Sequence, residues 1–466
     1  MDQATPQVII VGAGITGLSL AWRLAEHNVS FTILEQSNRP GGQIHTLHEN
    51  GYTFESGPNT GSISNPEVAE LFDFASPYAS LEEAASAAHC RLICKKGKLR
   101  VLPSGLLSGL STPLFSFSDK LRVACEPFRA KGDNPLESVG ALAQRRLGKS
   151  IVDYAVDPFV GGIYASDPYF LTAQYALPKL YNLEQEYGSF IRGALAKAKI
   201  KKSERERRAT KAVFSSKGGL QNLVEALAHK LSQQGSLCYS TTIESVRYTA
   251  EGNWQISYHE ADKESQIVEA PFYVTTVRGD LLRDVLPPVL YDHLAPIEQL
   301  LYAPIWEIAV GFDHYKGDGR RAFGALIPTK EKRDLLGVLF PSDCFSDRVP
   351  YKDSRLFTLF MGGLRDGNRF ISLSEEELQQ KGLKDLYALL RIPHSLEPSM
   401  VHLSYFPKAI PQYGIDSEER LKAIMRLESD YPGLYLAGGI RDGIGMAHRI
   451  KQGSDLALEI IQKLQR

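Results

Sequence analysis

Short apolar runs followed by glycine-rich turns and helix-period segments stand at both ends of the chain. Val8–Val11 precedes apolar residues at helical spacing and a second apolar run at Phe31–Leu34. Leu434–Ala437 precedes the turn at Gly438–Gly445 and a helix pattern that continues through Ile461. Runs of this length predict buried strands, and the helical periodicity predicts helices that cover them. The two ends of the chain are therefore predicted to contribute strand–turn–helix units to one parallel sheet.

A third set of elements lies in the middle of the chain. A helix pattern at Leu220–Leu231 leads into segments of alternating polarity near Thr241–Tyr248 and Trp254–Tyr258, and then into the apolar run Phe272–Val277. Alternating polarity predicts half-buried strands, so we interpret these segments as a β-meander that returns to the first sheet. Because elements of one sheet are scattered so widely, we expect a discontinuous domain with other domains inserted between its parts.

The turn after the first predicted strand has the spacing of a dinucleotide-binding motif. Gly12, Gly14 and Gly17 form G-x-G-x-x-G between a strand and a helix, and Glu35 ends the next strand. Gly12 permits a tight turn, Gly14 lets the backbone approach a pyrophosphate, and Gly17 allows close packing of helix on strand. The helix N-terminus then faces the phosphates, and Glu35 can accept hydrogen bonds from ribose hydroxyls. This context predicts dinucleotide binding.

Three further segments resemble FAD enzymes of the amine-oxidase superfamily. These are the second glycine pair in EQSNRPGGQIHT, the constrained turn Gly57-Pro58-Asn59, and LYLAGGIRDGIGMAHRI, which is similar to the closing FAD segment. The resemblance implies FAD, bound without a covalent link because the closing segment has no cysteine. Gln43 stands where the family usually has Arg, and we interpret Arg441 and Asp442 as an ion pair with each other near the surface. The predicted cofactor-binding residues are Gly12, Gly14, Ile15, Thr16, Gly17, Glu35, Gln36, Gly41, Gly42, Gly57, Pro58, Asn59, Thr60, Val246, Gly438, Gly439, Ile444, Gly445 and Met446.

The predicted fold class is α/β combined with α+β. A chain of 466 residues exceeds the size at which one hydrophobic core keeps growing, so several domains are expected. We expect a discontinuous Rossmann-like FAD-binding domain, a substrate domain with a mixed sheet, and a helical insertion that binds a membrane. The predicted ranges are 1–78, 210–278 and 425–466 for the FAD-binding domain, 79–95 and 279–424 for the substrate-binding domain, and 96–209 for the insertion.

Internal blocks resemble the protoporphyrinogen oxidase family. They are ESVGALAQRRLGKSIVDYAVDPFVGGIYASDP, LPKLYNLEQEYGSFIRGAL, FGALIPTKEKRDLLGVLFPSDCFSDR, LFTLFMGG and AIPQYG. The resemblance implies FAD-dependent, six-electron oxidation of protoporphyrinogen IX to protoporphyrin IX in haem biosynthesis, with oxygen as acceptor and flavin N5 as the hydride acceptor. Leu326 and Leu339 would sandwich the macrocycle, Phe360 would stack on it, and Arg91 would pair with a propionate. Gly161 and Gly162 would line the other side; the residues predict no metal site and leave any catalytic base unassigned.

Other functions remain open at this stage. The same fold acting on coproporphyrinogen III would need more cations at the rim of the pocket. An amine oxidase or a carotenoid-type desaturase would share the flavin motifs but not the internal blocks. Ser166, which replaces a family glycine, and the departures at Gln43 and Arg441 also motivate a flavin-binding scaffold or sensor without turnover.

The charge and hydropathy of the chain argue against nucleic-acid binding and against a membrane-spanning helix. The formal net charge is −1 with 23% charged residues, so no whole-protein field favours nucleic acid. No stretch approaches the roughly 18 apolar residues that a spanning helix needs, and the N-terminus has no signal-peptide pattern. We expect a cytoplasmic protein, peripheral on the inner face of the cell membrane, with Leu102–Phe117 as its contact segment. The basic run KAKIKKSERERRATK is either a solvated loop or a second contact with anionic lipid; a homodimer and hand-over to a ferrochelatase are further hypotheses from the resemblance.

Overall fold

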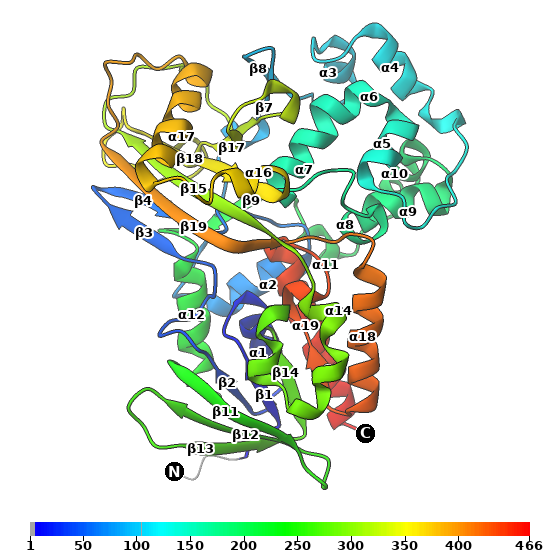
Figure 1. Ribbon diagram of the computed structural model, residues 1–466, viewed down its shortest axis with the longest axis vertical. Coiled ribbons are helices and arrows are strands. Elements are labelled where there is room, and N and C mark those ends of the chain that lie inside the picture. Colours follow the sequence, from blue (N-terminus) through cyan, green and yellow to red (C-terminus); the bar gives the residue numbers. More distant parts are fainter. Residues whose placement is uncertain (1–4, 104) are drawn as a thin grey trace.

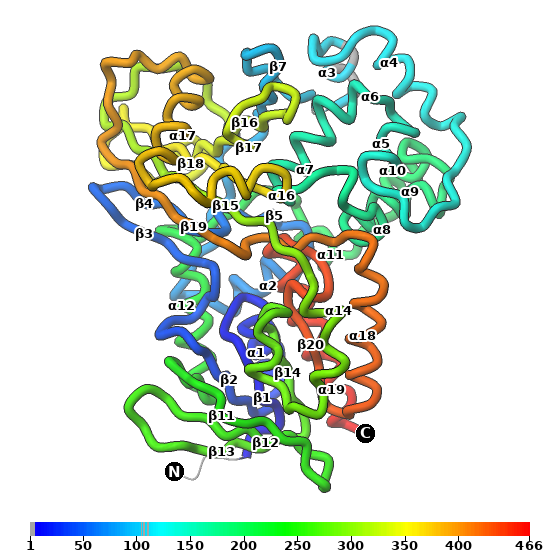
Figure 2. Tube along the Cα trace, viewed as in Figure 1, coloured from blue at the N-terminus to red at the C-terminus, as the bar shows by residue number. Residues whose placement is uncertain are grey.

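A parallel five-stranded sheet lies in the lower half of the molecule (Figure 1). The computed structural model describes residues 5–103 and 105–466. The strand order is β10-β2-β1-β14-β20, so strands from the two ends and the middle of the chain lie side by side, as the blue, green and red tubes of Figure 2 show. The predicted sheet is confirmed. Its strands are β1 (Val8–Val11), β2 (Phe31–Leu34), β10 (Ser236–Cys238), β14 (Phe272–Thr275) and β20 (Leu434–Leu436).

Four helices pack on one face of this sheet. Their buried apolar side chains share one core with Val8, Ile10 and Ile33 of the central strands. α1 and α19 pack closely, since a Cβ on Gly453 would lie 2.4 Å from the carbonyl oxygen of Thr16. The helices are α1 (Ile15–Glu26), α2 (Pro66–Ala75), α12 (Gln221–Leu231) and α19 (Met446–Leu464).

The predicted meander forms a separate antiparallel sheet of three strands. It packs with short helices around a second core that includes Ile9, Val11 and Trp254. After the meander, β14 joins the first sheet, as predicted. The elements on this side are β11 (Thr241–Tyr248), β12 (Trp254–Glu260), β13 (Gln266–Ala270), α13 (Leu282–Val285), α14 (Ala295–Glu298) and α18 (Ser417–Asp430).

A seven-stranded mixed sheet lies above the parallel sheet, in the order β19-β15-β18-β17-β16-β7-β8 (Figure 1). One face is packed against α17 (Glu375–Leu390) through a core that includes Trp306, Leu359 and Leu386. Its strands are β7 (Arg91–Lys95), β8 (Lys98–Val101), β15 (Tyr302–Phe312), β16 (Gly324–Leu326), β17 (Leu335–Leu339), β18 (Arg355–Gly362) and β19 (Met400–Pro411), with α15 (Pro341–Cys344) and α16 (Gly363–Asp366) in its connections.

The helical insertion stands beside this sheet at the upper right of Figure 1. β8 precedes it and still belongs to the mixed sheet. The insertion contains α3 (Leu106–Ser111), α4 (Phe117–Ala124), α5 (Val139–Leu147), α6 (Lys149–Ile151), the π-helical turn Val152–Val156, α7 (Asp157–Tyr164), α8 (Ala173–Ala176), α9 (Pro178–Tyr187) and α10 (Phe190–Ala198). The next helix, α11 (Glu204–Arg207), lies beside α2 (Figure 1).

Two small sheets connect these parts. One is the hairpin of β3 and β4, and the other has the order β5-β9-β6. None of the helices in residues 5–103 and 105–466 has the length and apolar character needed to cross a membrane. The strands are β3 (Thr46–Glu49), β4 (Tyr52–Glu55), β5 (Gly61–Ser62), β6 (Leu81–Glu83) and β9 (Val213–Ser216).

Candidate active site

The glycines of the turn between β1 and α1 have two different roles. Some allow close backbone packing, and one leaves free space beside the backbone. Gly12 has φ of +105° and donates its N–H to the carbonyl of Leu34 at 2.9 Å. A Cβ on Gly17 would lie 2.0 Å from the carbonyl oxygen of Gly12, whereas a Cβ on Gly14 would meet no atom within 4 Å. Gly17 therefore serves packing, and Gly14 leaves an open backbone surface at the N-terminus of α1. That surface fits a pyrophosphate. Ile15 and Thr16 follow in the first turn of the helix.

Glu35 joins the end of β2 to this turn. Its side chain is 8% exposed, and Oε2 accepts the N–H of Ala13 at 2.6 Å. Oε1 accepts the N–H of Ser37 at 2.8 Å. A carboxylate has about four acceptor positions, so lone pairs remain for ribose hydroxyls after both backbone bonds are made. Gln36 is exposed immediately after it.

The second glycine pair packs directly on the first turn. Gly41 donates its N–H to the carbonyl of Ala13 at 2.8 Å, and Gly14 and Gly41 form an isolated parallel bridge. A Cβ on Gly42 would lie 3.4 Å from the Cα of Gly14. The structure thus brings the two predicted glycine motifs together as one backbone cradle.

The closing segment meets this cradle at Thr276, a residue that the sequence analysis missed. A Cβ on Gly12 would lie 2.5 Å from Oγ1 of Thr276, and one on Gly438 would lie 2.7 Å from its carbonyl oxygen. Thr276 directly follows β14, at the carboxyl edge where parallel sheets bind ligands. Gly439 and Gly445 leave their Cβ directions nearly open, with the nearest atoms 3.5 Å away. Ile444 is half-buried, and Met446 begins α19.

Arg441 and Asp442 do not pair with each other, so that interpretation is wrong. Arg441 donates Nε to the carbonyl of Leu436 at 2.7 Å and forms an ion pair with Glu428. Asp442 instead pairs with Arg449 at 3.0 Å. The two side chains diverge because α18 offers the carboxylate and α19 offers the guanidinium, on opposite sides of the turn.

The predicted apolar substrate residues share one face of the mixed sheet. Leu326 lies opposite Gly337, and Gly337 lies opposite Phe360 on the next strand. Leu339 is two residues after Gly337 and points to the same side. All three predicted side chains are half-buried, on the face opposite α17. Together they form an apolar wall.

Arg91 and the Gly161-Gly162 pair border this wall. Arg91 lies opposite Gly324, so it projects from the same face, and it is exposed with its guanidinium 5.6 Å from the centre of the Phe323 ring. A Cβ on Gly162 would lie 2.3 Å from Cδ2 of Leu326, whereas one on Gly161 would meet no atom within 4 Å. α7 of the insertion therefore closes one side of the wall.

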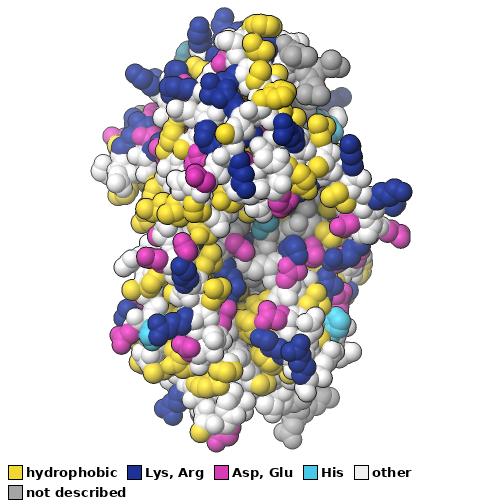
Figure 3. Space-filling view, turned by 90° about the vertical axis from the view of Figure 1, so that its right-hand side faces the viewer, with side chains coloured by type: hydrophobic (Ala, Val, Ile, Leu, Met, Phe, Trp, Pro, Cys, Tyr) yellow, Lys and Arg dark blue, Asp and Glu magenta, His cyan; other side chains and the backbone are white. Residues whose placement is uncertain are grey.

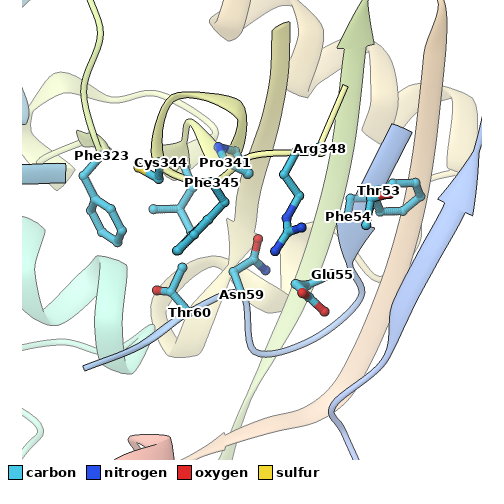
Figure 4. Close-up of a pocket in the computed structure, with 11 residues that line it drawn as sticks. Thr53, Phe54, Glu55, Asn59, Thr60, Phe323, Pro341, Cys344, Phe345 and Arg348 are labelled. Atoms are coloured by element: carbon cyan, nitrogen blue, oxygen red, sulfur yellow. The ribbon is translucent and has the colours of Figure 1, made fainter. Parts of the chain in front are cut away.

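Asn59 and Thr60 lie near one end of the wall. They line a narrow pocket with Leu339, Phe323 and Arg348 (Figure 4). Its volume is about 10 Å³, which is the scale of one water molecule. The sequence-predicted cofactor turn and the sequence-predicted substrate wall therefore meet here.

Glu307 is a buried carboxyl group that the sequence analysis did not single out. It is 2% exposed, and its Oε2 accepts the N–H of Gly57 at 3.0 Å. Burial raises the pKa of Glu307 to about 8, although hydrogen bonds from Asn59 and Gly57 act against this rise. The signal in the sequence is an acidic residue inside the apolar run YAPIWEIAVGF.

Val246, a predicted cofactor-binding residue, and Ser166, which replaces a family glycine, are both buried. Val246 is 6% exposed in the core beneath the meander, so its side chain presents little surface to a ligand. Ser166 is also buried, at 3%, directly after Ala165 with φ of +50°. Within the described residues, no cluster of His, Cys, Asp and Glu could hold a metal ion.

The open glycine cradle, the acidic residue at the end of β2 and the parallel sheet define a dinucleotide-binding protein. Residues 15–443 match the family of flavin containing amine oxidoreductases, and the chain belongs to this family. It is an FAD-dependent oxidoreductase, and the predicted fold class is confirmed.

Several relatives and one solved structure are similar to this chain over nearly its whole length. The chain is 29% identical to protoporphyrinogen oxidase 2 of Arabidopsis thaliana, over 98% of this chain and 94% of the relative. It is 26% identical to coproporphyrinogen III oxidase of Staphylococcus aureus, over 99% of this chain and 100% of the relative. A crystal structure of a proposed protoporphyrinogen oxidase from Exiguobacterium sp. 255-15 has the same fold, with a TM-score of 0.78, 22% identity, and coverage of 99% of this chain and 100% of that one.

Proposed function

We propose that this protein oxidises protoporphyrinogen IX to protoporphyrin IX, with oxygen as the electron acceptor. The observation that carries this proposal is the shared sheet face, on which Leu326, Leu339 and Phe360 form an apolar wall and Arg91 stands at its border. A wide apolar macrocycle with carboxylate substituents needs such a combination. The names of the relatives from Arabidopsis and other organisms support the same substrate class.

The roles of the chain follow from its geometry. FAD, when bound, supplies the hydride acceptor for the oxidation of the macrocycle. Gly14, Gly42 and Gly439 offer open or closely approaching backbone for its diphosphate and ring portions, and Glu35 accepts hydrogen bonds from its ribose. The apolar wall orients the macrocycle and excludes water, while Arg91 pairs with a propionate through its planar guanidinium.

The test is porphyrin fluorescence on mixing the flavin-loaded protein with protoporphyrinogen IX in air. Coproporphyrinogen III is run in parallel, with an autoxidation blank for each substrate. We expect a rate above the blank that is higher for protoporphyrinogen IX. Absence of a rate with both substrates, despite bound FAD, would exclude porphyrinogen oxidation.

The coproporphyrinogen reading is the second candidate, because the Staphylococcus relative carries that name. Coproporphyrinogen III has more carboxylates, so it needs more cationic side chains at the rim of the substrate pocket that are not already paired within the protein. Arg365 follows β18 in α16, close to the wall, but its guanidinium is bound to Asp157 at 2.6 Å and to Asp167 at 2.9 Å. This engagement favours the substrate with fewer carboxylates.

Replacement of Arg91 by alanine tests the propionate contact. A hydrogen bond to a charged group contributes about 1.5–3 kcal/mol, so KM for protoporphyrinogen IX should rise roughly 10- to 150-fold. FAD content should stay unchanged, because Arg91 lies on the substrate sheet and not in the glycine cradle. Steady-state kinetics measure KM, and the ratio of flavin to protein absorbance measures the FAD content. Arg247→Ala, which removes an exposed arginine from the meander, is the matched control; an unchanged KM in Arg91→Ala contradicts the assignment.

We also propose peripheral attachment to the cytoplasmic face of a membrane through the helical insertion. Phe117 and Leu121 are one helical turn apart on α4 and are 82% and 56% exposed, and Phe128 is 83% exposed. Yellow apolar and dark-blue basic side chains lie next to each other at the top of Figure 3. In the predicted segment Leu102–Phe117, residue 104 and the side chains of residues 106, 107 and 110 lie outside the described residues.

The basic run is a weaker candidate for lipid contact. Arg205 pairs with Glu70 at 2.6 Å, and Arg208 pairs with Asp73. Both arginines therefore form ion pairs with carboxylates of α2, and through them the basic run packs on the FAD-binding part of the chain. The lipid proposal therefore rests on α4 and its neighbours.

The double variant Phe117→Asp/Phe128→Asp should lose binding to vesicles that contain anionic lipid. Aspartate at these positions removes apolar surface and is repelled by the headgroups. Co-sedimentation of the flavin-loaded protein with vesicles measures the bound fraction, which should fall at least tenfold. Ile267→Asp alters another exposed apolar residue, 68% exposed on the meander, and this variant should bind vesicles as the unmodified protein does. Equal binding by the double variant would rule out this contact surface.

A further inference from the structure

Glu307 lies at the edge of the apolar wall, on the strand next to Phe360. On β15 it is opposite Phe360 on one side and Ser404 on the other, so its side chain projects from the same face as Leu326 and Leu339. A buried carboxyl group is costly unless hydrogen bonds compensate its lost hydration. At 2% exposure, Glu307 must obtain those bonds from the protein.

Both of its oxygens are used by one turn of the FAD-binding part. Oε2 accepts the N–H of Gly57 at 3.0 Å, and Oε1 accepts a hydrogen of the Asn59 side-chain amide. The same amide nitrogen donates to the carbonyl of Gly57 at 3.0 Å. Glu307 therefore fastens the Gly57-Pro58-Asn59 turn to the substrate sheet.

This arrangement fixes which end of the Asn59 amide is free. Two acceptors, the Glu307 carboxyl and the Gly57 carbonyl, surround the nitrogen, and the reversed amide would place its oxygen against both of them. Both N–H groups are thereby engaged. Among the hydrogen bonds of the described residues, no protein donor reaches Oδ1 of Asn59. Asn59 is half-buried and lines the narrow pocket of Figure 4, which Leu339 of the wall also lines.

We propose that Glu307 is a positioning residue that holds the Asn59 carbonyl oxygen toward the substrate as an acceptor for a pyrrole N–H. The inference rests on the proposed function, because a porphyrinogen carries N–H groups around its centre and an oxygen acceptor can register one of them. Asn59 only accepts this hydrogen bond and takes up no proton. Its role is to orient the macrocycle against the apolar wall.

Glu307→Gln tests the inference through the orientation of Asn59. The turn presents two donors to residue 307, the N–H of Gly57 and the side-chain NH₂ of Asn59. A glutamine can accept only one of them, because its second group is itself an NH₂ donor. Asn59 can satisfy the new NH₂ group only by turning its oxygen inward, which directs its own NH₂ group at the substrate. We expect anaerobic flavin bleaching by protoporphyrinogen IX to slow at least tenfold, while FAD content and reoxidation of the photoreduced flavin by oxygen remain unchanged.

A second substitution should restore the lost acceptor. In Glu307→Gln/Asn59→Asp, one aspartate oxygen accepts from the glutamine and the other faces the substrate again. The first oxygen also lies against the Gly57 carbonyl, which Asn59 bonded before, so we expect part of the bleaching rate to return. Ser404→Ala is the matched control, because Ser404 lies on the same sheet face and bonds to Ser56 of the same segment at 2.9 Å without touching Asn59. It should bleach at the rate of the unmodified protein.

The outcomes separate this inference from the function on which it rests. If the unmodified protein is not bleached by either porphyrinogen, the proposed function fails. If it is bleached but Glu307→Gln is equally fast, or the double variant recovers nothing, the positioning role is overturned. If Glu307→Gln does not fold, Asn59→Leu tests the same inference. A normal bleaching rate in Asn59→Leu would also overturn the positioning role.

Discussion

Replacing Gly14 by valine should give a folded protein that contains no flavin. Gly14 has φ of −69°, which any residue can adopt, and its Cβ would point into open space with no atom within 4 Å. The Cβ of valine therefore meets no protein atom, and the side chain occupies the surface where the FAD diphosphate approaches the backbone. The flavin absorbance per protein should fall to the background level.

The control for this variant lies three residues further on. A Cβ on Gly17 would lie 2.0 Å from the carbonyl oxygen of Gly12, so Gly17→Val should disrupt the strand–helix contact itself. Thermal unfolding of each variant is compared with flavin-free unmodified protein, because bound FAD would stabilise the folded state by itself. Gly14→Val should unfold near the temperature of that reference and Gly17→Val well below it. A Gly14→Val protein with full yellow colour would refute the placement of the diphosphate.

The second large effect is expected in the helical insertion. Arg146 is fully buried between Glu126 and Glu184, which are also fully buried, and it donates Nε to Glu126 at 2.7 Å and Nη1 to Glu184 at 3.0 Å. Arg146→Ala leaves the buried carboxylate of Glu126 without its ion-pair partner, whereas Glu184 keeps its pair with Arg145 at 2.8 Å. Breaking a buried ion pair in this way costs about 3–5 kcal/mol, so the free energy of unfolding of the insertion should fall by that amount.

Hydrogen exchange localises this loss. Amides of α5, α9 and α10, which surround the cluster, should exchange faster in Arg146→Ala, while those of the parallel sheet should be unaffected. Lys149→Ala removes a cation from the same part of the chain, but its pair with Asp153 is exposed, with 71% of the lysine side chain accessible. Exposed pairs contribute about 0–1 kcal/mol, so that control should change exchange little. Equal exchange in the two variants would contradict a structural role for the buried cluster.

The elements with strong local patterns were predictable from the sequence. The apolar runs of β1, β2, β14 and β20 and the alternation of β11 and β12 depend on neighbours a few residues away, and the structure has them where the pattern places them. The glycine motif was predictable for the same reason, since the turn, the helix N-terminus and the acidic strand end are all local. The family match then confirmed the flavin.

The partners of charged side chains were not predictable in this way. Arg441 and Asp442 are adjacent in the sequence, and adjacency suggested a pair, but the nearest opposite charges come from α18 and α19. Glu307 reads as an interruption of an apolar strand, and only the approach of the Gly57-Pro58-Asn59 turn gives it two donors. The Glu307 contact joins residues 250 apart, and the partners of Arg441 and Asp442, although only 13 and 7 residues away, are set by how α18 and α19 pack around the turn.

The sequence by itself determined the strand–turn–helix units, the nucleotide-binding motif and the residue types of the substrate wall. Only the tertiary structure decided that Leu326, Leu339, Phe360 and Arg91 share one sheet face, that Thr276 joins the two glycine turns, and that Glu307 fixes Asn59. The physical reason is that periodicity and turn geometry are short-range properties of the backbone, whereas strand register and the pairing of buried polar groups are set by packing between distant segments.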